Sequence, residues 1–366
     1  MKRIQGLDGL RAIAIIGIII YHLLPSFLPG GFLGVNLFFV LSGFLLTYTS
    51  LNDIHGKGFT VLNFYKKRVL RIYPALILLV LTACFFAWIF TPNAMYGMRR
   101  EVMSIFLGYN NWWQISRNAS YFARISSVSP FTHLWCIAVE LQYYLVWPLL
   151  LMICLLLEVK AHFKSEYFLL ILAGVSFVES IILLRPGQDP TRVYYGTDTR
   201  AYALLVGSAL GFIIERKIRT GNRSVKQAPA FTRMIAEIAL GLALPVMLVF
   251  YFFAEGQSIL TYRLFMPLTV LLSVCVIYLC ADTDIQVIRL PKLEFLQELG
   301  AYSYEAYLVM FPVISIVTRT VRTSSRVPVV VLSVVLIIAG TFWLHQVTTS
   351  LFKKDKSVSS VRRSVN

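Results

Sequence analysis

Two ionisable side chains, Arg11 and His22, interrupt the first long apolar stretch of the sequence. In an α-helix, residues eleven positions apart lie within about 20° of the same face, with a rise of roughly 16 Å between them. Ionisable groups inside a membrane span are costly and often functional. His22 can exchange a proton near neutral pH, and Arg11 can bind an anion. The alternatives are a buried, hydrogen-bonded histidine and an arginine that only anchors the end of a span.

Basic residues at positions 66–71 directly precede the third long apolar stretch. Within this segment Arg68 and Arg71 share one helical face, because residues three positions apart are neighbours on a helix surface. Two guanidinium groups at that spacing suit a phosphate group. The same residues would also serve as a cytoplasmic anchor of the span, since positive charge is enriched in cytoplasmic loops.

A carboxylate, Glu140, lies inside the apolar stretch 134–157, on the same helical face as His133 and Tyr144. A buried carboxylate needs a partner, because burying an unpaired charge is costly. This stretch crosses in the opposite direction to the first one, so we expect Glu140 at roughly the depth of His22. A His22–Glu140 pair across two helices is then one hypothesis, and a structural, hydrogen-bonded glutamate is the other.

The segment 194–200 places Asp198 and Arg200 directly before another apolar stretch. A carboxylate and a guanidinium group can bind a hydroxylated acceptor. They can equally cap the following helix and pair with each other.

Membrane helices must position these side chains. Of the 366 residues, 57% are apolar and only 14% are charged, whereas soluble domains have about 25% charged residues. Each long apolar stretch approaches the roughly 20 residues that a helix needs to cross the hydrocarbon core. We therefore predict an all-α fold, a polytopic membrane helix bundle. The ten predicted spans are 10–27, 32–50, 72–90, 134–157, 167–184, 201–215, 236–253, 262–280, 300–318 and 327–349.

The distribution of Lys and Arg predicts the orientation of these spans. With both termini in the cytoplasm, the inner segments hold more than twice as many Lys and Arg as the outer ones, which is the bias expected of cytoplasmic loops. The segment 102–115 is short and carries amide side chains, so we predict an interfacial or re-entrant piece rather than a span. The predicted orientation places Lys57 and the C-terminal tail in the cytoplasm.

The remaining features narrow the class of protein. Residues 1–352 form the predicted membrane domain, and the Lys- and Arg-containing stretch 353–366 forms a basic tail that we expect to be disordered. The five cysteines lack paired metal-ligand spacing, so no metal site is predicted. The net charge of +16 lies in short gaps between apolar stretches, which indicates a membrane-lipid environment and no nucleic-acid partner.

Six blocks of sequence stand in order along the chain: Leu7–Arg11 with His22, 31–47, Arg68–Pro74, His133–Tyr144, Gly196–Arg200 and Tyr302–Pro312. Together they resemble the signature blocks of the membrane acyltransferase-3 family, within it the transmembrane part of bacterial cell-wall and polysaccharide O-acetyltransferases. The resemblance covers nearly the whole chain.

The resemblance is incomplete at four positions. Asn36 stands where many members have Asp, Leu141 where many have a second Glu, Cys136 where Ser is usual, and Met310 where many have His. Position 310 is therefore no catalytic candidate, whereas Asn36 still offers a hydrogen bond. Many cell-wall members also carry an extracytoplasmic hydrolase-like domain, but this sequence has no Gly-Asp-Ser nucleophile block.

The resemblance implies an O-acyltransferase of the cytoplasmic membrane of a bacterium. This enzyme would move an acyl group, expected to be acetyl, from acyl-CoA to a hydroxyl of a cell-wall glycan, exopolysaccharide or similar carbohydrate. The resemblance implies these roles: Arg11, Arg68 and Arg71 bind the phosphates of acyl-CoA at the cytoplasmic side, His22 is the general base or a transient acyl acceptor, Glu140 orients His22, and Asp198 and Arg200 bind the acceptor at the outer face. The acceptor either reacts directly within the bundle or receives the acyl group through a separate extracytoplasmic transferase.

Two other classes of function remain open on the sequence. A transporter or flippase for a lipid-linked or sugar substrate would use the intramembrane ionisable residues as a proton relay, although no inverted repeat is visible. A scaffold or sensor without catalytic activity would leave Arg11 and His22 unexplained.

Overall fold

A computed structural model describes residues 4, 6–56, 58–92, 98–120, 122, 129–221, 230–281, 291, 293–321 and 325–363, with the backbone alone described at 230–237, 239–240 and 352–363. The regular structure in these ranges is helical throughout. The helices are α1 (Leu7–Leu23), α2 (Gly34–His55), α3 (Val61–Phe90), α4 (Met98–Phe106), α5 (Asn110–Ser116), α6 (Trp135–Ala161), α7 (Ser165–Leu183), α8 (Thr191–Tyr195), α9 (Thr197–Thr220), α11 (Ala230–Phe253), α12 (Met266–Ala281), α13 (Glu294–Ala301), α14 (Ser303–Thr320) and α15 (Arg326–Arg363). Short 3₁₀ or π turns precede α2, α6 and α12: η1 (Gly31–Leu33), η4 (Thr132–Leu134) and η5 (Thr261–Phe265).

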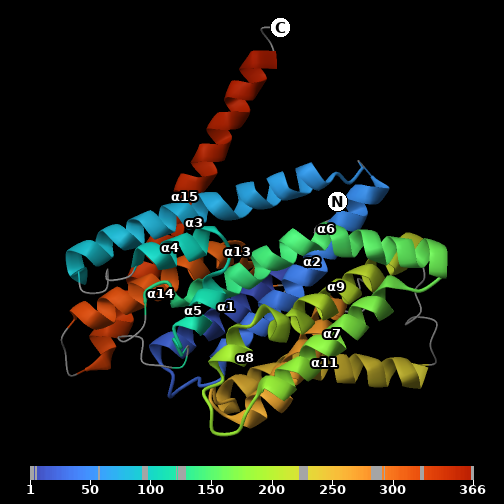
Figure 1. Cartoon of the computed structure of the whole chain (residues 1–366), viewed down its shortest axis with the longest axis horizontal. Helices are drawn as coiled ribbons and strands as arrows, with labels where there is room; N and C mark the ends of the chain where they lie inside the picture. Colours follow the sequence, from blue (N-terminus) through green and yellow to red (C-terminus); the bar gives the residue numbers. More distant parts are fainter. Residues whose placement is uncertain are drawn as a thin grey trace.

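The long helices run alongside one another as a bundle (Figure 1), which confirms the predicted polytopic helical architecture. Each of the ten predicted spans falls on a helix: α1, α2, α3, α6, α7, α9, α11, α12, α14 and α15. Among the described residues, six helices are long and apolar enough to cross a membrane, or seven if α13 and α14, bent by 65°, form one span. The chain is therefore a multi-pass membrane protein, and ten is an approximate count.

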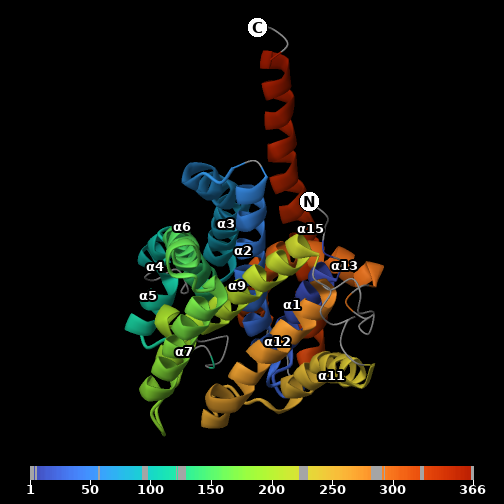
Figure 2. The ribbon, with the colours of Figure 1, turned by 90° about the vertical axis from the view of Figure 1, so that its right-hand side faces the viewer.

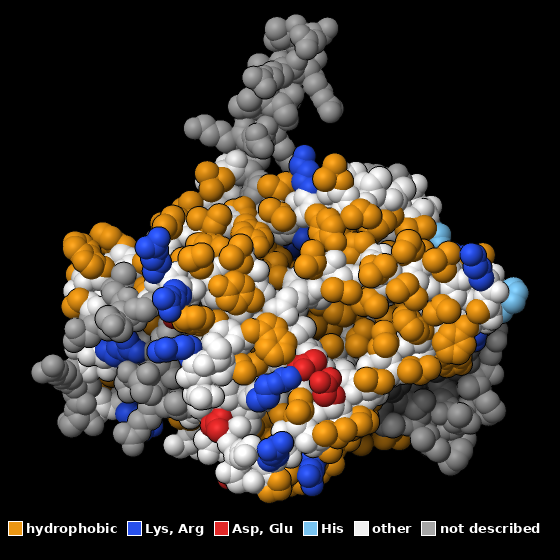
Figure 3. All heavy atoms as spheres, in the orientation of Figure 1, with side chains coloured by type: hydrophobic (Ala, Val, Ile, Leu, Met, Phe, Trp, Pro, Cys, Tyr) orange, Lys and Arg blue, Asp and Glu red, His pale blue; other side chains and the backbone are white. Residues whose placement is uncertain are grey.

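The outer surface of the bundle is apolar. Leu145, Leu149, Met152 and Leu156 on α6 and Ile171, Val175, Val178 and Ile182 on α7 are exposed. Figure 3 shows this apolar face, interrupted by a small cluster of acidic and basic side chains near α8. Exposed aliphatic rows of this kind face lipid rather than water.

Glycines allow α2 and α9 to cross at close range. A Cβ atom on Gly43 would lie 1.9 Å from the carbonyl oxygen of Leu204, and one on Gly207 would lie 2.1 Å from that of Val40. Small residues at helix crossings let backbones approach, which is how membrane helices gain packing energy without a hydrophobic driving force. This crossing fixes α9 against the helix that lines the site.

The segment 102–115 forms the short helices α4 and α5, separated by Gly108 at φ +72°, and not a span. The C-terminal stretch differs from the prediction, because α15 continues as one helix to Arg363 and projects from the bundle (Figure 2). The expected disordered tail is thus helical over 353–363. Lys57 and residues 364–366 lie outside the described residues.

Candidate active site

A cavity of about 220 Å³ lies between α1, α2, α3, α6 and α14. It is lined by Arg11, Phe38, Ser42, Arg68, Arg71, Ile72, Cys136, Ile137, Glu140, Tyr144, Ala301, Ser303, Tyr304, Glu305 and Tyr307. We call it the basic cavity, because three arginines line it against two carboxylates. The structure thus brings together four residues that the sequence analysis proposed as functional on three separate stretches, namely Arg11, Arg68, Arg71 and Glu140.

Two of these arginines are free to receive an anion. Arg68 lies over the rings of Phe64 and Tyr144 at 5.6 and 5.3 Å, and its guanidinium donates to Oγ1 of Thr49 at 3.3 Å. Neither Arg68 nor Arg71 is within ion-pair distance of a carboxylate in the described part of the chain. The neighbouring Lys67, by contrast, pairs with Asp53 outside the cavity at 2.7 Å.

Arg11 is partly neutralised, since its guanidinium pairs with Asp8 one turn earlier on α1 at 3.0 Å. Its side chain is one-fifth exposed and reaches the cavity from the opposite wall to α3. The cavity therefore offers one compensated and two uncompensated cations, an arrangement that suits a multiply charged phosphate ligand.

Glu140 lies inside the basic cavity and accepts a hydrogen bond from Oγ of Ser42 on α2. It interacts electrostatically with Arg71, Arg11 and Arg68. The expected His22–Glu140 pair is not what the structure shows, because Glu140 lies with the arginines and His22 does not line this cavity. In the structure Glu140 offsets part of the charge of the guanidinium cluster without forming an ion pair.

Tyrosines from α14 close the cavity. Tyr304 donates its hydroxyl hydrogen to the carbonyl oxygen of Ile72 on α3 at 2.9 Å, and Tyr307 donates to the carbonyl oxygen of His133. The thiol of Cys136 donates to the Tyr307 hydroxyl at 2.9 Å. The sequence placed both tyrosines in a family block, but only the structure shows that Tyr307 connects the basic cavity to His133.

His22 lies in a second layer of the bundle. Its Nδ1 is 2.8 Å from the carbonyl oxygen of Ile18, so Nδ1 carries the hydrogen and Nε2 the lone pair. The ring edge packs against Phe311 of α14, with centroids 5.1 Å apart. Arg11 lies eleven residues earlier on α1, so the backbone positions of Arg11 and His22 are about 16 Å apart along the helix axis.

His133, from η4, contacts the same phenyl ring. It stacks on Phe311 with centroids 5.1 Å apart and an interplanar angle of 16°, and it interacts electrostatically with His22. The sequence placed His133 on the face of Glu140 without giving it a role. The structure instead makes it the titratable neighbour of His22.

Arg200 is fully buried, with 1% of its surface exposed. Its guanidinium donates to Oδ1 of Asn36 and to the sulfur of Met266, the latter at 3.0 Å. The rings of Phe39, Trp135 and Tyr194 surround it at 5.3–6.0 Å. The predicted acceptor-binding arginine therefore lies in the helix core, where Asn36 accepts a hydrogen bond from it.

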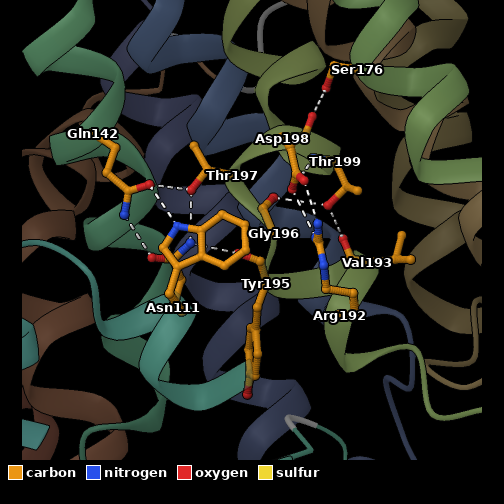
Figure 4. A network of polar contacts seen from close by, with 11 residues as sticks. Asn111, Gln142, Ser176, Arg192, Val193, Tyr195, Gly196, Thr197, Asp198 and Thr199 are labelled. Carbon is orange, nitrogen blue, oxygen red and sulfur yellow. Dashed lines mark hydrogen bonds and ion pairs between the residues drawn. The ribbon is translucent and has the colours of Figure 1, made fainter. Parts of the chain in front are cut away.

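Asp198 pairs with Arg192 through two hydrogen bonds and not with Arg200 (Figure 4). Burial alone would raise the pKa of Asp198, but Arg192 and the backbone N–H of Thr199 outweigh burial and lower the pKa below its ordinary value. The guanidinium of Arg192 also lies 5.1 Å from the Trp112 ring. Asp198 thus fixes the turn between α8 and α9.

Amide side chains join this turn to α5 and α6 (Figure 4). Asn111 donates to the carbonyl oxygen of Tyr195 at 3.0 Å and to Oγ1 of Thr197 at 2.9 Å. Gln142 donates to Oδ1 of Asn111 at 2.9 Å. Together with Trp112, Arg192 and Asp198 these residues form what we call the outer polar network. Within the described residues, no group of three or more His, Cys, Asp or Glu side chains is placed to hold a metal ion.

Comparison with known proteins gives the family. The model of the acyltransferase domain matches residues 4–346. The chain is 32% identical over 321 residues to the peptidoglycan O-acetyltransferase OatA of Listeria monocytogenes, covering 87% of this chain and 50% of that protein. It is 34% identical over 326 residues to the putative peptidoglycan O-acetyltransferase YrhL of Bacillus subtilis, covering 87% and 49%. It is 39% identical over 216 residues to the O-acetyltransferase OatA of Staphylococcus aureus, covering 58% and 35%. The chain thus spans about half the length of the first two relatives. No solved structure matches it.

Proposed function

Because the chain belongs to the membrane acyltransferase-3 family, we propose that it is an O-acyltransferase of the cytoplasmic membrane. It moves an acetyl group from cytoplasmic acetyl-CoA to a hydroxyl of a cell-wall glycan or a similar carbohydrate at the outer face. The observation that carries this proposal is the basic cavity, where Arg68 and Arg71 have no ion-pair partner among the described residues and α1 leads from the cavity to a buried histidine, His22.

The basic cavity fits the donor. Arg68 and Arg71, supported by Arg11, would hold the phosphates of the donor at the inner end of α3, because guanidinium groups bind phosphate oxygens in pairs. From there a thioester on an extended arm must reach about 16 Å along α1 to meet His22. Glu140 limits the repulsion among the three arginines.

His22 provides the reactive nitrogen. The carbonyl oxygen of Ile18 holds Nδ1–H, which leaves the Nε2 lone pair to take either the proton of the acceptor hydroxyl or the acyl group itself. Both tasks require a neutral imidazole at the operating pH. A buried, apolar setting beside Phe311 also excludes the water that would hydrolyse the thioester.

The acceptor enters from the outer side in this proposal. Trp112 and Tyr109 are each more than one-third exposed there, and aromatic faces with neighbouring amide and carboxylate groups suit a sugar. Asp198 belongs to this surface. Arg200 lies beneath it in the helix core and supports α9 rather than touching the sugar.

Labelled acetyl-CoA sealed inside liposomes that contain the purified protein tests the proposal, with candidate glycans outside. Wild-type protein should release CoA and acetylate a glycan. His22→Ala should abolish turnover but keep acetyl-CoA binding, whereas Arg68→Ala or Arg71→Ala should weaken binding by about 1–3 kcal/mol. Lys67→Ala is the matched control, since Lys67 pairs with Asp53 outside the cavity. Normal turnover by His22→Ala would overturn the mechanism, and glycan movement without thioester turnover would indicate a transporter.

The same liposomes separate two routes to the acceptor. We propose direct transfer within the bundle. Acetylated glycan formed by this chain alone supports that route. Glycan modified only after a separate extracytoplasmic transferase is added would contradict it.

A further inference from the structure

His133 has an unused basic nitrogen in the core of the bundle. Its ring is completely buried, and its Nε2 is 3.1 Å from the carbonyl oxygen of Leu308. Because a carbonyl oxygen can only accept, Nε2 carries the hydrogen and Nδ1 carries the lone pair. Among the residues that the structure describes, no donor reaches Nδ1.

An unsatisfied buried acceptor costs about 1–3 kcal/mol. A protein core usually avoids that cost by pairing the group or replacing it with an apolar one. The ring is also held in place, since Phe311 stacks on one face and the Tyr307 hydroxyl bonds to the backbone of the same residue. A rigid imidazole with a free lone pair is prepared to receive a hydrogen from a molecule that is not part of the chain.

The position of His133 indicates which molecule. Cys136 and Tyr307, which line the basic cavity, join it to His133 through hydrogen bonds, and His22 and His133 both contact Phe311. His133 also belongs to η4, which precedes α6 at the end that the predicted orientation places outside. It therefore lies in the layer of His22, near the side from which the acceptor arrives in the proposed mechanism.

We propose that His133 is a second catalytic histidine, the base that deprotonates the acceptor hydroxyl, and that His22 carries the acyl group. This rests on the acyltransferase function proposed above. In the first step Nε2 of His22 bonds to the acyl carbon and the carbon–sulfur bond breaks, with its electron pair leaving on the CoA thiolate. In the second step the acceptor oxygen bonds to that carbon and the carbon–nitrogen bond breaks, returning its electron pair to Nε2. The hydroxyl proton moves to Nδ1 of His133 and then to the thiolate, so atoms and charge balance.

These two roles predict that acylation of His22 and transfer to the acceptor can be separated by substitution. In His133→Gln the side-chain amide can still donate to Leu308, but no basic nitrogen remains. Loss of a general base typically slows its step by about 10²–10⁴-fold. Because the first step does not need His133, the variant should accumulate acyl group on His22 while glycan acetylation falls by that factor.

Rapid-quench labelling with radioactive acetyl-CoA in the full-length protein tests the proposal. His133→Gln should trap close to one acetyl group per chain, and the double variant His22→Ala/His133→Gln should trap none. His162→Gln, at the exposed opposite end of α6, is the matched control and should behave as wild type. Acetyl-CoA binding and thermal unfolding of each variant show whether it is folded.

Three results would overturn the inference. They are normal glycan acetylation by folded His133→Gln, loss of acetylation without trapped acetyl group, and trapping that persists when His22 is removed. If His133→Gln does not fold, His133→Ala with added imidazole replaces it, and failure of imidazole to restore any transfer would also count against the base. A wild-type protein that shows no thioester turnover would contradict the proposed function itself, so the two failures are distinguishable.

Discussion

The buried Asn36–Arg200 contact leads to a prediction about stability. Asn36 accepts from the guanidinium of Arg200 and donates to the carbonyl oxygen of Met266 at 3.3 Å, and neither side chain is exposed by more than 1%. Among the described residues no carboxylate lies within ion-pair distance of Arg200, and its Nε has no partner. The amide of Asn36 is therefore the main compensation for a buried positive charge.

Asn36→Leu keeps the approximate shape of the side chain but removes this compensation. A hydrogen bond to a charged group contributes about 1.5–3 kcal/mol, and leaving a buried charge without its partner costs up to about 3–5 kcal/mol. The aromatic rings around Arg200 retain part of the attraction. We therefore expect Asn36→Leu to lower the free energy of unfolding by about 2–4 kcal/mol.

The double variant Asn36→Leu/Arg200→Met distinguishes this cause from a packing defect. Replacing both partners by apolar groups can be nearly neutral, so we expect the double variant to lie within about 1 kcal/mol of wild type. The measurement is equilibrium unfolding of the four proteins in mixed detergent micelles, read as a double-mutant cycle. Additive losses, or a loss below about 0.5 kcal/mol in Asn36→Leu, would refute the reasoning. An unchanged acceptor KM in the double variant would also confirm that Arg200 acts through the fold.

Three further predictions concern the crossing of α2 and α9, the outer polar network and the topology. Gly43→Ala should lower the free energy of unfolding by about 1–3 kcal/mol, because the added Cβ would overlap a backbone oxygen of α9. Gly174→Ala is the control, since a Cβ added at Gly174 would meet no neighbouring atom within 4 Å, and it should be neutral or stabilising in the same unfolding assay. Arg192→Gln should lower the free energy of unfolding by about 0.2–1 kcal/mol near pH 7. The partner of Arg192, Asp198, has a lowered pKa in the folded state. The stability difference between wild type and variant should therefore vanish as the pH falls below the ordinary aspartate pKa of about 3.9. Lys57→Cys and Ser357→Cys should react with a membrane-impermeant thiol reagent only after cells are opened, and labelling of intact cells would contradict the cytoplasmic assignment.

The apolar stretches were sufficient to predict the helices. Each stretch is long enough to require a helix in a membrane, because only internally bonded backbone is stable there. Even 201–215, which belongs to the relatively polar helix α9, was found. The cluster of Arg11, Arg68 and Arg71 was also predictable as a group, since basic residues near the inner ends of adjacent spans lie at one depth.

Depth within the membrane could not be predicted at the level of a single turn. His22 and Glu140 were expected at one height, but it is His133 that shares the Phe311 contact with His22, while Glu140 lies in the basic cavity. His133 and Glu140 are about two helical turns apart, which corresponds to roughly 10 Å. The sequence shows which positions along α6 are polar, but it does not show the depth of α6 relative to α1.

The pairing of Asp198 failed for a different physical reason. Residues two positions apart in a helix point in different directions and do not face each other, so Asp198 and Arg200 separate as soon as α9 begins at Thr197. Arg192 reaches Asp198 because the chain reverses between α8 and α9. That turn has no strong sequence signal beyond Gly196.

The resulting separation of charge has a consequence for the direction of the reaction. Cations that suit phosphate line the basic cavity, two histidines contact Phe311 in the next layer, and the outer polar network holds amide groups and the Asp198–Arg192 pair. In the proposed mechanism an anionic donor is attracted to the first of these layers, while an uncharged hydroxyl needs no such cation. The thioester would then reach His22 from the basic cavity, and a sugar hydroxyl would reach His133 from the outer side. Such an arrangement would make the proposed acyl transfer directional without movement of the whole donor.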